Sequence, residues 1–199
     1  MDLTTVIPDQ PARDAAERAG KNPAVVELVV AEASELMRVA QGVIIARHRT
    51  GHVLANAGID ASNVEDEGGR GVALLWPVDP DASARRLRDE LQRRFGVTLA
   101  VIVGDSMGRA WRMGTTGTAI GVAGIRPLRD RCGETDLFGS ELQATVVGVA
   151  DEIAAAASLV IGEGAEGTPV AIVRGATYET DDIAVAADLL RPLDKDLFR

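Results

Sequence analysis

Acidic and small polar side chains gather in two short segments, and the second of them has residue types that suit a divalent cation. Asp60 lies in a loop rich in Asn, Gly and Ser, and Asp105 and Ser106 follow the apolar run at residues 98–103. Carboxylate and hydroxyl oxygens are the hard ligands that Mg²⁺ and Mn²⁺ prefer, and ligand clefts form just beyond the carboxyl ends of buried strands in open α/β sheets. The same residue types also build ordinary turns, in which an Asp side chain bonds its own backbone. The residues alone leave that alternative open.

Two arginines follow the second acidic segment. Arg109 and Arg112 can clamp a phosphate or a carboxylate through paired hydrogen bonds. The chain has only two lysines, Lys21 and Lys195, so anion recognition falls mainly to arginine side chains and backbone N–H groups. The alternative for this segment is a capping turn in which Trp111 packs against the body of the protein.

A third segment combines glycines with acidic residues. Its members are Gly162, Glu163, Gly164, Ala165, Glu166, Gly167 and Thr168. Successive glycines let backbone N–H groups approach an anion or a flat base closely. The two glutamates argue against a simple phosphate site, but they can accept hydrogen bonds from the edge of a base. The alternative is the end of a helix followed by a surface turn.

Several common kinds of catalytic site are excluded. The sequence contains no G-x-x-x-x-G-K-[ST] phosphate loop, no H-E-x-x-H zinc motif and no G-x-S-x-G nucleophile elbow. His48 and His52 fall on a predicted strand pair, so we expect surface or hairpin histidines rather than metal ligands. Cys132 is the only cysteine and has no histidine near it in the sequence. It therefore predicts neither a disulfide nor a thiol nucleophile.

Composition predicts a soluble globular protein with a single domain over residues 1–199. Hydrophobic residues make up 46% of the chain, which is enough for a sizeable core. The net charge of −9 argues against nucleic acid as a partner, because nucleic-acid binding needs a basic face. No apolar run is long enough to cross a bilayer, and the first residues do not resemble a secretion signal. We therefore expect a cytoplasmic protein without a membrane partner.

Three helices and one short helical tail are expected. Apolar spacing predicts helices at residues 24–40, 81–94 and 141–161. The last of these is poor in charge, so we expect it to be central. A short helix is expected in the acidic tail after Thr180.

The strands are expected to be short and apolar. They are predicted at residues 43–46, 72–76, 98–103, 118–125 and 169–173. Residues 52–54 should pair back onto the first strand through Thr50–Gly51, and 98–103 should be buried on both faces. Residues 104–117 show no apolar period. Since helices and strands alternate without a regular βαβ rhythm, we predict a mixed α/β (α+β) body.

Taken in order, these motifs resemble the coenzyme F420-0:L-glutamate ligase family, also called the F420:gamma-glutamyl ligases. The matching stretches cover nearly the whole chain and are residues 55–63, 104–117, 119–125, 136–139, 150–152 and 162–164. The resemblance implies the F420:gamma-glutamyl ligase-like fold, with a central mixed sheet flanked by helices. It also implies an intertwined homodimer.

The resemblance implies a GTP-dependent ligase that adds L-glutamate to the phospholactyl carboxylate of coenzyme F420-0 through an acyl phosphate. It assigns Asp60, Asp105 and Ser106 to a divalent metal, Mg²⁺ or Mn²⁺, and it assigns Asn63 and residues 162–168 to GTP. K⁺ is a further candidate cofactor. Our candidate catalytic residues are Asp60, Asp105, Arg109 and Arg112.

Two alternatives are kept beside this function. Family members begin with a few dozen further residues that carry nucleotide contacts, and residues 1–20 do not match them. We therefore expect either a fragment or a shortened member. The alternatives are a related amide ligase that acts on another substrate, and a non-catalytic homologue that binds the coenzyme or assists assembly without a full GTP site.

Overall fold

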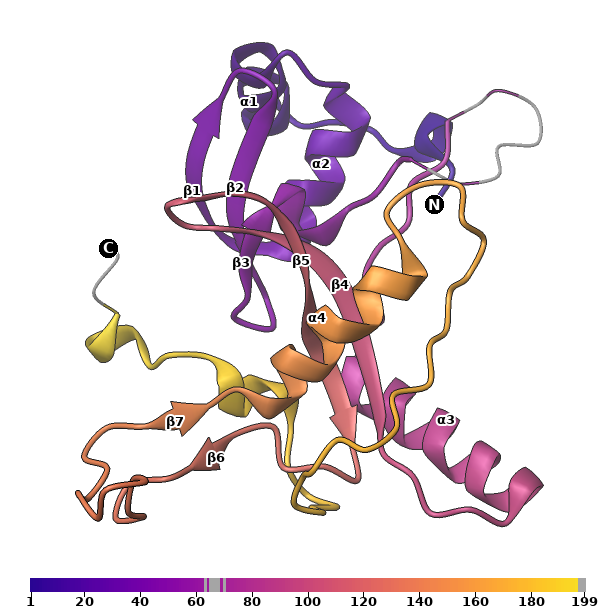
Figure 1. The fold of residues 1–199 in the computed structure, drawn as a ribbon. Helices are drawn as coiled ribbons and strands as arrows, with labels where there is room; N and C mark the ends of the chain where they lie inside the picture. The colour runs from indigo at the N-terminus through magenta and orange to yellow at the C-terminus, as the bar shows by residue number, and fades with distance from the viewer. Residues whose placement is uncertain (63, 65–68, 70, 197–199) are drawn as a thin grey trace. The chain divides into compact units, whose positions relative to one another are not determined.

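The computed structural model describes residues 1–62, 64, 69 and 71–196. Figure 1 shows the helices and strands along the chain. The chain divides into two compact units. Unit 1 contains Met1–Pro77 and Met107–Gly114, and unit 2 contains Val78–Ser106 and Thr115–Arg199. None of the described helices is both long and apolar enough to cross a bilayer.

Unit 1 opens with two helices whose ends follow local capping rules. Helix α1 (Gln10–Ala19) starts after Asp9, whose side chain accepts the Ala12 N–H at 2.8 Å. Helix α2 (Pro23–Glu32) starts after Asn22, whose side chain likewise accepts the Ala24 N–H. Such caps satisfy N–H groups that have no partner inside the helix.

The expected helix at residues 24–40 is only half correct. Helix α2 ends at Glu32, and the chain continues as strand β1 (Ala33–Ala40). Strand β1 pairs antiparallel with β2 (Val43–His48), with Ala40 opposite Val43. Gly42 has φ 84° and turns the chain between the strands. Pairing with β2 therefore overrides the helical spacing of the apolar residues, because tertiary contacts outweigh intrinsic propensity.

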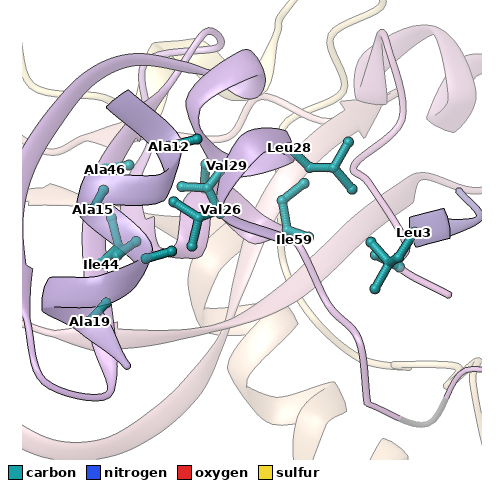
Figure 2. Close-up of a cluster of buried hydrophobic side chains, with 13 residues drawn as sticks. Leu3, Ala12, Ala15, Ala19, Val26, Leu28, Val29, Ile44, Ala46 and Ile59 are labelled. Atoms are coloured by element: carbon teal, nitrogen blue, oxygen red, sulfur yellow. The ribbon is translucent and has the colours of Figure 1, made fainter. Parts of the chain in front are cut away.

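The predicted hairpin after β2 is confirmed. Strand β3 (Val53–Ala55) pairs antiparallel with β2, which gives the sheet order β1-β2-β3. Burial alternates along β2, so that Ile44, Ala46 and His48 face inward. Figure 2 shows side chains of α1 and α2 gathered with those of β2 in one cluster, in which alanine predominates.

Unit 2 contains the best-predicted helix and a long hairpin. Helix α3 (Pro80–Phe95) ends at Gly96, which has φ 64°. Strands β4 (Val101–Arg109) and β5 (Arg112–Ala123) form a two-stranded sheet whose turn lies in unit 1. Residues 104–117 are therefore mostly strand, although they lack an apolar period. The expectation that residues 98–103 are buried on both faces is wrong, because Thr98 is exposed and residues 99–103 are only partly buried in a two-stranded sheet.

Helix α4 (Val149–Ile161) starts later than expected. Gly148 precedes it, and the residues before that form β7 (Val146–Val147), which pairs with β6 (Arg129–Asp130). The start of α4 is buried, whereas Leu159 near its end is 87% exposed. The short helix expected after Thr180 is present as two 3₁₀ helices, Ala186–Leu189 and Leu193–Lys195.

The mixed α/β class is confirmed, but within the described chain the strands form three small sheets instead of one central sheet. Residues 72–76 contribute only isolated bridges, and residues 169–173 form no strand. Pro169 has no N–H to donate to a strand ladder, which weakens the second of these segments as a strand.

Candidate functional site

The backbone before Asp60 makes an unusual turn. Asn56, Ala57 and Gly58 form one 3₁₀ turn, and all three have positive φ, at 52°, 49° and 73°. Asn56 Oδ1 is also buried and accepts no hydrogen bond from any described residue. Residues other than glycine rarely adopt this conformation, and strain of this kind tends to collect at functional sites. The turn carries the chain from β3 to Asp60.

Two neighbours fix the orientation of Asp60. Its backbone exchanges hydrogen bonds with Leu74, with N–H to O distances of 3.0 Å and 2.7 Å. Its Oδ1 accepts the N–H and the hydroxyl of Ser62, both at 2.7 Å. The turn that the residue types allowed is therefore present. In the described part of the chain no hydrogen bond reaches Oδ2 of this exposed carboxylate, so the group suits a cation ligand. Asn63 lies outside the described residues.

A buried cluster of aromatic rings packs against the turn that precedes Asp60. A Cβ on Gly58 would lie 2.6 Å from Cε2 of Trp76, so the indole ring lies directly against this glycine. The Trp76 ring in turn packs on His48 and His52, at centroid distances of 4.8 Å and 5.3 Å. Sequence reasoning missed Trp76, and its only signal was a tryptophan in a short apolar run.

The two histidines lie in the hairpin, as expected, but they are buried rather than on the surface. Thr50 donates its N–H to Nδ1 of His48, so the ring proton lies on Nε2, which donates to Glu32. Glu32 also pairs with Arg49. Among the described residues no group of three His, Cys, Asp or Glu side chains is arranged to hold a metal.

The burial of His48 predicts a pH dependence of stability. Burial lowers the pKa of His48 below its ordinary value, and the hydrogen bond to Glu32 offsets this only in part. The unfolded chain then binds the proton more readily than the folded one, so stability should fall as pH drops through about 6.5. Urea unfolding between pH 5.5 and 7.5 measures this, and His48→Gln should flatten the curve. A wild-type free energy of unfolding that rises as pH falls through this range would contradict the prediction.

Asp105 and Ser106 lie within β4 and not just beyond a strand, because β4 extends to Arg109. Asp105 is half-buried, and its Oδ1 accepts the Ser106 N–H at 2.8 Å. Asp60 belongs to unit 1 and Asp105 to unit 2. The meeting of their carboxylates, with Ser106, around one cation stays a prediction.

The turn between β4 and β5 exposes both candidate arginines. Arg109 and Arg112 flank the turn, and neither forms an ion pair with any described residue. A guanidinium N–H of Arg109 donates to the Met113 carbonyl at 3.2 Å. Trp111 has φ 64° and is 87% exposed, so it does not pack against the body of the protein. The capping-turn alternative is therefore wrong, and the arginines are available to an anion.

The glycine-rich segment after α4 forms an exposed turn that Glu166 closes. Gly162 ends the helix with φ 78°, and its N–H donates to Ser158. The Glu166 side chain accepts the Gly164 N–H at 2.8 Å and lies over Gly162. The alternative of a helix end and a surface turn is thus present, and nucleotide contact by residues 162–168 stays a prediction.

Cys132 is exposed. A hydrogen bond to Asp130 raises the pKa of its thiol above the ordinary value. A raised pKa leaves less of the thiol in the reactive thiolate form, and the absence of a thiol nucleophile stays a prediction.

Comparison with known proteins points to one family. The family model described as F420-0:Gamma-glutamyl ligase matches residues 1–175. The chain is 46% identical over 200 residues to the coenzyme F420:L-glutamate ligase of Methanothermobacter thermautotrophicus, with 100% of this chain and 78% of that protein covered. The enzyme of the same name from Methanocaldococcus jannaschii is 43% identical over 199 residues, with 100% and 78% covered. That from Methanopyrus kandleri is 42% identical over 202 residues, with 100% and 79% covered.

Proposed function

Because the chain belongs to the F420-0:gamma-glutamyl ligase family, we propose that it joins L-glutamate to the phospholactyl carboxylate of coenzyme F420-0 with GTP as co-substrate. The match over residues 1–175, which includes both acidic motifs, carries this proposal. The carboxylate takes the γ-phosphoryl group of GTP to give an acyl phosphate and GDP. The glutamate amine then attacks the acyl carbon, and phosphate leaves as the amide forms.

This reaction needs no nucleophile from the protein, which agrees with the absence of nucleophile motifs. Phosphoryl transfer depends on holding the reactants in line and neutralising their charge. Neutralisation of the triphosphate is the chemistry that bound Mg²⁺ or Mn²⁺ supplies. Asp60, Asp105 and Ser106 are the proposed ligands, and the family match over residues 1–175, which includes all three, supports that role.

Anion binding is assigned to the arginines of the β4–β5 turn. Arg109 and Arg112 are exposed and form no ion pair within the described chain. Their guanidinium groups match the paired oxygens of phosphates and carboxylates. We assign the nucleotide to Asn63 and residues 162–168, and we keep K⁺ as a candidate additional cation.

A homodimer in the cytoplasm is the proposed state of the protein. Leu137 and Phe138 support a partner copy, because they are 92% and 91% exposed on a turn that Asp136 closes through two backbone N–H groups. Large exposed apolar side chains of this kind mark interaction surfaces.

Incubation of the full chain with GTP, Mn²⁺, L-glutamate and the glutamate-free coenzyme tests the function. Mass spectrometry should show a glutamyl adduct, and GDP should form in equal amount. Omission of the coenzyme should stop GDP release. A folded preparation that forms no adduct would overturn the proposal, and an adduct formed only with another amino acid or carboxylate would redirect it to a related ligase.

A further inference from the structure

We infer that the tip of the β4–β5 hairpin, formed by Arg109, Ala110, Trp111 and Arg112, is the binding site for the coenzyme substrate, with Trp111 stacked on its flat deazaflavin ring. The inference rests on the proposed function, because it identifies the surface that recognises the substrate of that reaction. Four observations on the hairpin tip carry it.

The first observation is a conflict between the residue at the turn and its backbone. Trp111 is the second of two residues between the strands and has φ 64°. Turn positions with positive φ normally hold glycine or asparagine, because a Cβ is strained there. A tryptophan at this position lowers local stability. Local rules are broken in this way where function requires it.

The second observation is exposure. Trp111 is 87% exposed, and the neighbouring Met113 is 98% exposed. An exposed indole ring offers a large rigid face with few rotatable bonds, which suits stacking on another flat ring. Trp76, the only other tryptophan in the sequence, is 7% exposed, so the two tryptophans differ strongly in exposure.

The third observation is the charge beside the ring. Arg109 and Arg112 are the residues on either side of a two-residue turn, which places them opposite each other across the hairpin. Like charges in this relation destabilise a strand pair, and an anion bound between them removes the penalty.

The fourth observation is tethering. The hydrogen bond from the Arg109 guanidinium to the Met113 carbonyl holds this charge against strand β5, next to the turn. The tip therefore presents a flat aromatic face beside two cationic forks. The coenzyme has the complementary chemistry, since a flat ring system is linked to a phosphodiester and a carboxylate. GTP is the nearest competitor for the same chemistry, and a second copy of the chain is the other possible occupant of the exposed ring.

The two tryptophans allow a direct test by fluorescence in the full chain. Trp76→Phe leaves Trp111 as the only tryptophan, and Trp111→Phe leaves only the buried Trp76. The glutamate-free coenzyme should quench Trp76→Phe more strongly than Trp111→Phe at the same coenzyme concentration, because a stacked ring quenches on contact as well as by energy transfer. Because both samples contain equal coenzyme, absorption of light by the ligand cancels. Equal quenching of the two variants would overturn the inference.

The second measurement is the affinity for the coenzyme of variants at the hairpin tip, determined by isothermal titration calorimetry. Trp111→Ala should weaken coenzyme binding about tenfold or more, as expected for the loss of a ring that stacks on a base. Arg109→Gln and Arg112→Gln should also weaken it, whereas the exposed control residues Ile7→Ala and Arg86→Gln should not.

Further outcomes distinguish binding of the coenzyme at the hairpin tip from binding of GTP or of a second copy of the chain. If the variants of the hairpin tip bind GTP more weakly but bind the coenzyme as the wild type does, the tip belongs to the nucleotide site and the inference is overturned. A lower mass of Trp111→Ala in sedimentation, with unchanged coenzyme binding, would assign it to a second copy and also overturn it. If the wild-type chain binds no coenzyme at all, the proposed function fails as well. If it adds glutamate while Trp111→Ala binds normally, only this inference fails.

Discussion

Asp60→Asn should lower the rate of glutamate addition by at least about a thousandfold while the chain stays folded. The Asn side chain keeps the Oδ1 that accepts the N–H and hydroxyl of Ser62, so the turn is preserved. It replaces the charged Oδ2 with an NH₂ group, which cannot bind a cation. The cation contributes several kcal/mol to such a reaction, and each 1.4 kcal/mol is about tenfold in rate. Asp105→Asn should have an effect of the same order.

Asp14→Asn is the matched control. Asp14 lies in unit 1 and also accepts a side-chain hydrogen bond through Oδ1, from Gln10 at 2.7 Å. Asp14→Asn removes one negative charge, as Asp60→Asn does. The variant should keep the wild-type rate of glutamate addition within about twofold, as surface substitutions generally do. Mn²⁺ binding followed by electron paramagnetic resonance gives a second readout, since Asp60→Asn should bind the ion more weakly. Unchanged turnover and unchanged Mn²⁺ binding would remove Asp60 from the site.

Gly58→Ala should destabilise unit 1 by about 2–5 kcal/mol and weaken Mn²⁺ binding. The φ of 73° costs an alanine about 1–2 kcal/mol. The new methyl group would also meet the Trp76 ring, at 2.6 Å from Cε2, and overpacking adds about 1–3 kcal/mol. Because Gly58 is two residues from Asp60, displacement of the turn should also move the carboxylate.

Gly42→Ala separates the two causes. Gly42 has φ 84°, but no atom lies within 4 Å of the position that an added Cβ would take, so this change carries only the backbone strain. It should cost about 1–2 kcal/mol and leave Mn²⁺ binding unchanged. Urea unfolding of both variants measures the difference. Equal losses of stability would show that Trp76 does not press on the turn.

Local signals predict part of the fold well. The charged residues of α3 lie between Asp79, which accepts the Ala82 N–H, and Gly96, so both ends are encoded within a few residues. The hairpin from β2 to β3 is likewise encoded by Thr50–Gly51. Strand β1 could not be predicted in this way, because its conformation depends on pairing with β2, while its apolar residues also fit a helix.

The candidate site shows the same division between local and long-range information. The turn at Asp60 and the helix end at Gly162 are apparent from residue types alone. The support of the turn by Trp76 is not, because it joins segments 18 residues apart and depends on the positive φ of Gly58. The exposure of Trp111 was missed because a tryptophan is ordinarily taken for a core residue.

The interior of unit 1 also limits how the scaffold can change. Helix α1 turns Ala12, Ala15, Ala16 and Ala19 inward, and each is almost completely enclosed. A methyl group is thus the largest side chain that this helix can present to the sheet, and longer ones would force the layers apart. Divergence among relatives should therefore concentrate in turns and exposed strands, where new specificities can arise without disturbing the interior.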